Sequence, residues 1–325
     1  MRSITRRLLI LPPALLLVHF LGFAYAHLVR PLRAATNPFL AGDGDPEPLL
    51  STYLAYLREV GETGLGIMPE AHFTLPASIA AAIAQTALAS LGLLALALAI
   101  STTLGVAIGV LAARTQPPAI RRWLTAVSTT GLAMPTFFVG ALFFSAWFLY
   151  AKLTPPGTSL PIPLLGFGWD LHVVMPVLVL SIRPTVQMAQ LTAGMLVEEF
   201  NQQYVVAARA LGHSWRQIRL KDAFRNIYAP VILTVAGSLR MLVGELIVVE
   251  WLFDWPGIGR LLAETLIPSG TAFNQGGGST ETSLFLAPAV MAAVLVVFAA
   301  LFMLVDAVAS LLARLSDPRL REPGA

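Results

Sequence analysis

The sequence predicts an all-α polytopic membrane protein with six transmembrane helices. Of its 325 residues, 56% are hydrophobic and only 12% are charged, whereas about 25% of residues are charged in soluble domains. A spanning helix needs about 20 mainly apolar residues. Six stretches meet that need, at residues 1–29, 83–111, 124–150, 171–193, 227–250 and 284–312.

The first stretch, residues 1–29, has two interpretations. Three arginines precede an apolar run that begins at Leu8, which fits a retained first transmembrane helix. The same run, with Ala24-Tyr25-Ala26 before His27, also fits a cleaved signal peptide. Both interpretations stay open on the sequence alone.

Positive charge predicts how the chain is oriented. Fourteen lysines and arginines lie in the segments on the N-terminal side of the membrane, and five lie in the segments on the opposite side. Because cytoplasmic loops carry the excess of positive charge, both termini are expected in the cytoplasm. Residues 30–80 then form a periplasmic or extracellular loop, with a short helix at 53–60. The glycine-rich segment 274–279 is expected to be a flexible tip of the last external loop.

Several kinds of chemistry are excluded by inspection. Neither lysine, Lys152 nor Lys221, follows a glycine, so the chain has no phosphate-binding loop of the usual type. There is no cysteine, no H-E-x-x-H and no G-x-S-x-G. The net charge of +3 is too small to indicate a nucleic-acid partner. We therefore expect no catalytic residue, no metal site and no cofactor on this chain.

The polar segment 198–226 interrupts the apolar pattern and predicts two short helices with a break. The first covers 204–211, and Gly212 is suited to end it in a left-handed conformation. Ser214 and Gln217 have capping-box spacing, which begins the second helix. His213 between them is expected to be plain polar surface.

One face of the first helix is predicted to dock on another protein. Tyr204, Ala208 and Leu211 share this face, with small residues at Ala207 and Ala210 beside it. The apolar side chains at 205, 206 and 211 would otherwise be exposed to water. A loop that merely connects two membrane helices is the alternative.

Two separated motifs carry a resemblance to a known family. The first is Ala207-Ala208-x-x-x-Gly212 followed by Asp222-Ala223-Phe224-Arg225-Asn226, and the second is the run from Glu250 to Leu261, EWLFDWPGIGRL. With a closing Asp317-Pro318-Arg319, they resemble binding-protein-dependent ABC importer permeases of the dipeptide, oligopeptide and nickel branch. The similarity covers roughly residues 75–321.

The resemblance implies a type I ABC importer permease fold with a permease core at 81–321 and a coupling loop at 198–226. It implies a multi-pass protein of a prokaryotic cytoplasmic (inner) membrane, embedded in lipid. The implied partners are a second permease subunit in a heterodimer, two ATP-binding cassette ATPases that hold ATP and Mg²⁺, and an extracytoplasmic solute-binding protein. The residues that would couple to the ATPase are Tyr204, Val205, Ala207, Ala208, Arg209, Leu211 and Gly212.

The cargo implied by the resemblance is a di- or oligopeptide, with nickel or another non-peptide solute as the alternative. Two other classes stay open. An ion-coupled secondary carrier would use intramembrane carboxylates such as Glu245 and Asp306, but it leaves the capped loop unexplained. A membrane enzyme would need a catalytic set that the chain lacks.

Ionisable residues inside apolar stretches mark a transport path or an ion pair. Arg240 and Glu245 are five residues apart, about 140° around a helix, so they are poorly placed to pair with each other. They either face a polar cavity shared with a second subunit or form buried interhelical ion pairs. Glu250 has either a role in a gate of the transport path or a structural role beside the helix break that follows it. The candidate path and gate residues are Arg240, Glu245, Glu250, Trp255, Pro256 and Gly257.

Overall fold

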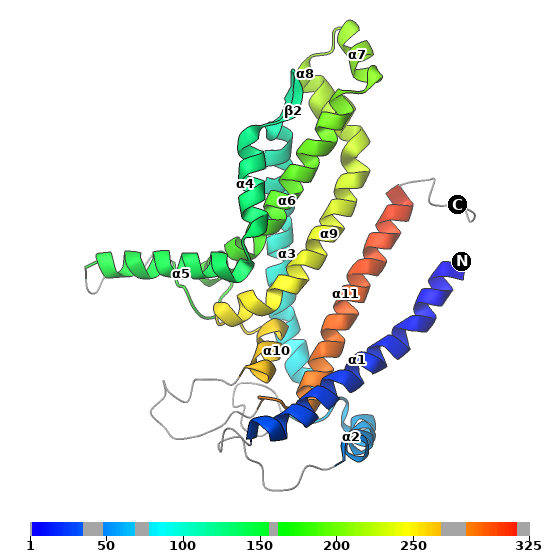
Figure 1. The fold of residues 1–325 in the computed structure, drawn as a ribbon, viewed down its shortest axis with the longest axis vertical. Helices are drawn as coiled ribbons and strands as arrows, with labels where there is room; N and C mark the ends of the chain where they lie inside the picture. The colour runs from blue at the N-terminus through cyan, green and yellow to red at the C-terminus, as the bar shows by residue number, and fades with distance from the viewer. Residues whose placement is uncertain (1, 35–47, 69–77, 156–161, 268–283, 317–325) are drawn as a thin grey trace. The chain divides into compact units, whose positions relative to one another are not determined.

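The computed structural model describes residues 2–34, 48–68, 78–155, 162–267 and 284–316, and the chain in these ranges is mainly helical (Figure 1). The glycine-rich segment 274–279 and the closing Asp317-Pro318-Arg319 lie outside them. The elements are α1 (Arg2–Ala34), α2 (Leu49–Thr63), α3 (Ile79–Ala112), β1 (Ala113–Thr115), β2 (Pro118–Ile120), α4 (Arg122–Ala133), α5 (Thr136–Leu153), η2 (Leu171–Val173), α6 (Val174–Phe200), α7 (Gln203–Ala210), α8 (Trp215–Gln217), the π-helical turn η3 (Ile218–Ala223), α9 (Phe224–Leu252), α10 (Ile258–Leu266) and α11 (Pro288–Ser316).

The six predicted spans are confirmed. Within the described ranges, six helical segments are long and apolar enough to cross a bilayer: Leu9–Arg33, Ile79–Ala112, Thr136–Leu153, Leu171–Phe200, Trp215–Leu252 and Pro288–Leu312. Pro184 lies inside α6 and Pro230 inside α9, and both helices continue past the proline.

One predicted span is wrong in its boundaries. The stretch 124–150 was expected to be a continuous helix, but α4 ends at Ala133 and α5 begins at Thr136. Met134 and Pro135 between them are extended, with ψ of 123° and 146°. Proline disfavours helical geometry at the preceding residue and cannot donate a backbone hydrogen bond, so the chain breaks here.

The chain divides into two compact units. The first contains Met1–Ser90 and Pro256–Phe302, and the second contains Leu91–Trp255 and Met303–Ala325.

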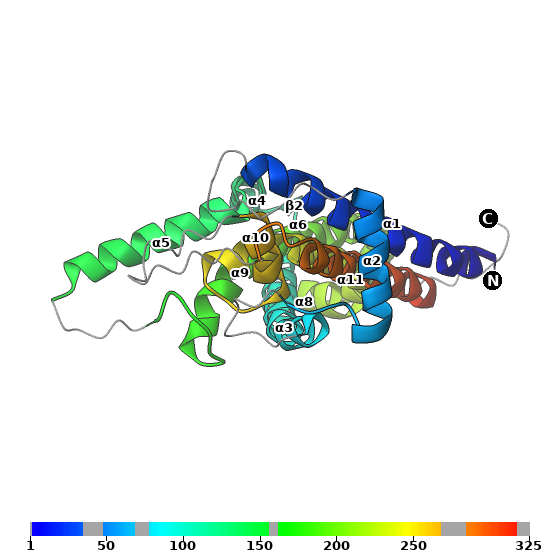
Figure 2. The ribbon, with the colours of Figure 1, turned by 90° about the horizontal axis from the view of Figure 1, so that it is seen from below.

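In the first unit, α2 crosses α1 (Figures 1 and 2). Aromatic side chains make the contact between the two helices. Phe23, Tyr53 and Tyr56 form the centre of this contact, and His19 Nδ1 lies 3.0 Å from the Tyr53 hydroxyl. Burial raises the pKa of Tyr56 to about 12, and its hydroxyl donates to the Leu65 carbonyl at 3.2 Å. The helix expected at 53–60 is therefore present as α2, fixed to α1 by rings.

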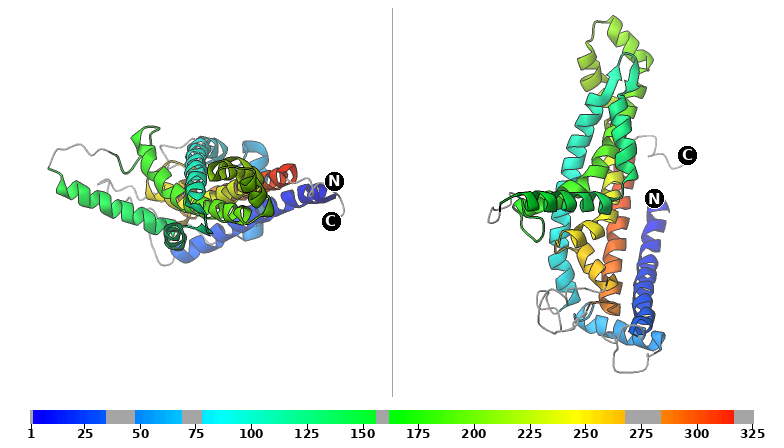
Figure 3. Two further views of the ribbon diagram at one scale, coloured as in Figure 1. Left: turned by 90° about the horizontal axis from the view of Figure 1, so that it is seen from above. Right: turned by 60° about the vertical axis from the view of Figure 1, so that its left-hand side comes forward.

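In the second unit, α6 and α9 form the most extensive helix contact, and α4 packs on α6. The antiparallel hairpin of β1 and β2 also packs on α6. α5 contacts α6 and α9 near its start and then projects away from them (Figure 3). The hairpin, α7 and α8 lie together at one end of this helix group (Figure 1).

Candidate functional site

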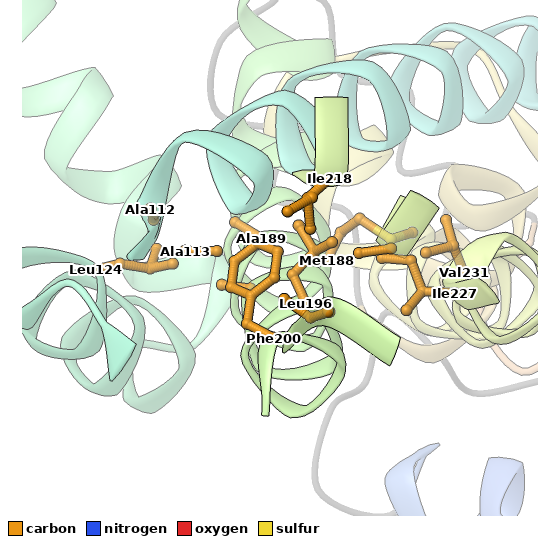
Figure 4. Packing of buried hydrophobic residues seen from close by; sticks show 13 residues of the cluster. Ala112, Ala113, Leu124, Met188, Ala189, Leu196, Phe200, Ile218, Ile227 and Val231 are labelled. Carbon is orange, nitrogen blue, oxygen red and sulfur yellow. The ribbon is translucent and has the colours of Figure 1, made fainter. Parts of the chain in front are cut away.

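The loop between α6 and α9 is built on a cluster of buried apolar residues (Figure 4). These residues come from the end of α3, from β1, from α4, α6, α7 and α9, and from η3: Ala112, Ala113, Leu124, Met188, Ala189, Ala193, Leu196, Phe200, Val205, Ile218, Ala223, Ile227 and Val231. The Arg219 guanidinium in η3 also donates to the Ala113 carbonyl at 3.0 Å. Two segments far apart in sequence, 112–121 and 198–226, are thus held together.

The first short helix ends as predicted. α7 stops at Ala210, and Gly212 has φ of +87°, the left-handed conformation. The Gly212 N–H donates to the Arg209 carbonyl at 3.0 Å, and the His213 N–H donates to the Ala208 carbonyl at 3.0 Å. These bonds satisfy carbonyls that the last helical turn leaves open.

The second helix also begins as predicted. The Gln217 N–H donates to Ser214 Oγ at 3.3 Å, and the Ser214 N–H donates to Gln217 Oε1 at 2.9 Å. Both halves of the capping box are therefore present. The chain then passes through η3 into α9 without leaving helical geometry.

The side chains of α7 divide between two faces. Val206 is 70% exposed and Leu211 is 81% exposed, whereas Val205 is only 2% exposed. The expectation that Val205 is exposed is wrong, because its side chain belongs to the buried cluster below α7. Tyr204 and Ala208 pack against the same cluster. The predicted docking face therefore splits: Leu211 lies on the open side, and Tyr204 and Ala208 face the protein.

Polar contacts hold the end of α7. The Arg209 guanidinium lies 5.2 Å from the ring centre of Trp215 and donates to the His213 carbonyl at 2.6 Å. His213 Nδ1 lies 3.0 Å from Asp222 Oδ2. His213 lies at the polar surface, with its side chain 45% exposed, and its imidazole also links the end of α7 to η3.

A second polar contact holds the start of α7. The Tyr204 hydroxyl donates to Glu199 Oε2 at 2.5 Å, and Asn226 Nδ2 donates to the same oxygen at 2.8 Å. Burial, together with the hydrogen bond to Glu199, raises the pKa of the Tyr204 hydroxyl, which therefore stays a donor at neutral pH. The adjacent pair Glu198-Glu199 was expected to be solvated surface, and nothing local marks Glu199 apart from Glu198 as the one that makes this contact.

The ionisable residues inside the spans are paired between helices. Glu245 on α9 accepts from Arg183 on α6, and Arg183 Nη2 also reaches the Leu132 carbonyl of α4 at 3.4 Å. Arg240 on α9 pairs with Asp306 on α11. Arg240 and Glu245 do not pair with each other, as predicted. The buried ion-pair interpretation fits Glu245, whose side chain is 11% exposed, whereas the side chains of Arg240 and Asp306 are paired but more than half exposed.

The second motif forms a helix break. α9 ends at Leu252, Asp254 has φ of +58°, and the Trp255 N–H donates to the Glu250 carbonyl at 2.9 Å. Gly257 then precedes the first residue of α10. Glu250 and Trp255 are both 0% exposed, which favours the structural interpretation of Glu250.

Trp255 is fixed by aromatic contacts within its own unit. Its ring meets the rings of Phe167 and Trp169 edge to face, with centroids 4.8 and 5.4 Å apart. Across the part of the chain that the structure describes, no three His, Asp or Glu side chains gather to form a metal site. The exposed apolar side chains of Val206 and Leu211 offer a surface to a partner.

Six apolar spans with a small capped helix held between two of them define a polytopic membrane protein with a structured polar loop. Residues 105–322 match the family described as "Binding-protein-dependent transport system inner membrane component", and the chain belongs to that family. It is a multi-pass inner-membrane permease subunit of an ABC importer with the type I permease fold, and it is not the catalytic subunit of that system.

Three relatives named as peptide or dipeptide permeases agree with this assignment. The chain is 26% identical over 314 residues to the dipeptide transport system permease protein DppB of Escherichia coli K12, covering 85% of this chain and 91% of the relative. It is 29% identical over 282 residues to a putative peptide permease protein of Brucella suis biovar 1, covering 86% and 82%. A probable peptide ABC transporter permease protein of Sinorhizobium fredii, y4tP, is 26% identical over 232 residues, covering 71% and 69%.

Proposed function

We propose that this chain forms half of the passage for a di- or oligopeptide in an ATP-driven importer. The peptide cargo is supported by three relatives that align with most of the chain and are named as peptide or dipeptide permeases. A second permease subunit would form the other half of the passage, and an extracytoplasmic solute-binding protein would deliver the peptide. Because the chain lacks a phosphate-binding loop, ATP and Mg²⁺ belong on two separate ATPase subunits.

The coupling element in this proposal is α7 with its Gly212 end. The observation that carries it is the exposure of Val206 and Leu211 on a helix whose opposite face is buried in its own chain. Apolar side chains presented in this way on a polar loop are typical of a docking surface. A groove of the ATPase would cover them, and nucleotide-driven movement of that groove would move α7.

The orientation in this proposal places both termini and α7 in the cytoplasm. It is supported by the fourteen lysines and arginines on that side of the membrane and the five on the other. α7 and the 112–121 hairpin, both on the predicted cytoplasmic side, lie at the same end of the second unit.

The candidate path and gate residues have a supporting role in this account. Arg240 and Glu245 would hold the helices of the passage wall together through their ion pairs with Asp306 and Arg183. Glu250 and the Trp255-Pro256-Gly257 break would fix the outer end of α9. None of them needs to bind the peptide for the proposal to hold.

Purification and reconstitution test the proposal. The tagged chain is purified in mild detergent from its own host, its associated proteins are identified, and the assembly is placed in liposomes. We expect an ATPase and a second permease subunit to accompany it, and ATP-dependent uptake of a labelled dipeptide once the binding protein is added. Uptake of a Ni²⁺ chelate or a sugar instead would reject the peptide cargo. Uptake by the chain alone, driven by an ion gradient without ATP, would reject the importer.

A further inference from the structure

The start of α7 is tied to both neighbouring membrane helices through a single oxygen atom. Glu199 lies in the last turn of α6, Tyr204 lies in the first turn of α7, and Asn226 lies in the first turn of α9. Glu199 Oε2 accepts from the Tyr204 hydroxyl at 2.5 Å and from Asn226 Nδ2 at 2.8 Å. Hydrogen bonds to a charged acceptor are roughly twice as strong as those between neutral groups. This three-way contact therefore joins α6, α7 and α9.

The other end of α7 has its own attachment. His213, which follows Gly212, contacts Asp222 in η3 at 3.0 Å, and η3 continues into α9. Between the two attachments, the side chain of Val205 is buried in the cluster beneath α7. A short helix held at both ends and along one face is expected to move with α6 and α9 as one body.

The two attachments leave the open face of α7 untouched. Val206 and Leu211 take no part in either attachment, and their exposed fractions are 70% and 81%. The residues that would bind a partner and the residues that tie α7 to the membrane helices are therefore different sets. A change in the second set need not alter the first.

We propose that Glu199, with its donors Tyr204 and Asn226, is the positioning group that transmits movement of α7 to α6 and α9. The proposal rests on the proposed function, in which an ATPase moves α7. Glu199 touches neither cargo nor nucleotide in this proposal. By fixing α7 to α6 and α9, Glu199 makes these helices move with α7. Without this contact, the loop would bend and α6 and α9 would stay in place.

The first experiment tests the contact in the permease alone. Backbone hydrogen exchange over residues 203–212 is measured in detergent for Tyr204→Phe and Asn226→Ala, each of which removes one donor. Glu198→Gln is the matched control, because Glu198 is the exposed neighbour of Glu199 and takes no part in the contact. We expect each donor variant to lose about tenfold in protection, the effect of losing one hydrogen bond to a charged group, and the control to match the unchanged protein.

The second experiment measures peptide transported per ATP hydrolysed by the whole transporter in liposomes. We expect both donor variants to retain the ATPase subunits and to hydrolyse ATP, while the transport-to-hydrolysis ratio falls severalfold. A purely structural role would lower assembly and both rates together and leave the ratio unchanged.

The outcomes separate this proposal from the one on which it rests. Unchanged exchange in both donor variants, or loosened exchange with an unchanged transport ratio, would overturn the role of Glu199 while the importer stands. If the unchanged protein associates with no ATPase, the importer itself fails, and the transmission role fails with it whatever the exchange measurement gives.

Discussion

Substituting Gly212 should be unfavourable only because of its backbone conformation, since a side chain would meet no neighbour there. Its φ is +87°, and no heavy atom lies within 4 Å of the position that a Cβ would take. Gly194 in α6 also has open space around its Cβ position but lies in ordinary helical geometry. Because neither position is crowded, comparing substitutions at Gly212 and Gly194 isolates the effect of the left-handed backbone at position 212.

Replacing Gly212 by Ala should destabilise the end of α7 by about 1–2 kcal/mol, the cost of left-handed geometry for a residue with a Cβ. Hydrogen exchange of the amides at 211–213 measures this change. Gly194→Ala should leave those amides unchanged, because alanine is favoured over glycine within a helix. Equal effects of the two substitutions would show that φ at position 212 is not the reason for the glycine.

The Arg183–Glu245 pair gives the second prediction at this scale. Glu245→Leu leaves a positive charge unpaired among membrane helices and should destabilise the protein by about 3–5 kcal/mol. Arg183→Leu with Glu245→Leu together should recover most of that loss, since no buried charge remains. Thermal unfolding in detergent measures both. A double variant as unstable as the single would mean that Glu245 is needed for something other than this pair.

At the scale of elements, local sequence rules predicted the helix ends better than the helix interiors. The left-handed residue after α7 and the capping box before α8 depend on neighbours within three residues, so the sequence contains all the information they need. The break at Pro135 was missed because Pro184 and Pro230, with the same local chemistry, lie within continuous helices. Whether a helix continues past proline depends on which neighbouring groups satisfy its freed carbonyls.

The capping box makes a further prediction for the long helical segment that begins at α8. Ser214→Ala removes the acceptor for the Gln217 N–H and should cost about 1 kcal/mol at this helix start. Ser145→Ala is the control, because the Ser145 hydroxyl bonds only a carbonyl four residues earlier in α5. Exchange of the Gln217 amide should rise in the first variant and stay constant in the second. No rise would contradict the cap.

At the scale of the whole molecule, the sequence predicted six spans and the place of the polar loop, because both depend on runs of hydrophobicity. It could not predict that Arg240 meets Asp306 while Glu245 meets Arg183, since partners 62 to 66 residues apart are set by helix packing. The division of α7 into a buried and an open face was also only partly predictable. Helical periodicity placed Tyr204, Ala208 and Leu211 on one face. Tyr204 and Ala208 pack against the buried cluster, whereas Leu211, one residue past the end of α7, is exposed.

The central claim is that α7 presents its open face to an ATPase inside the cell. Because the chain contains no cysteine, Leu211→Cys introduces a single thiol at an 81% exposed position. The most direct measurement is labelling of that thiol in intact and opened cells by a membrane-impermeant maleimide, followed by cross-linking in the purified complex. We expect labelling only in opened cells, protection when the ATPase is bound, and a cross-link to the ATPase. Labelling in intact cells, or labelling unaffected by a bound ATPase, would contradict the account.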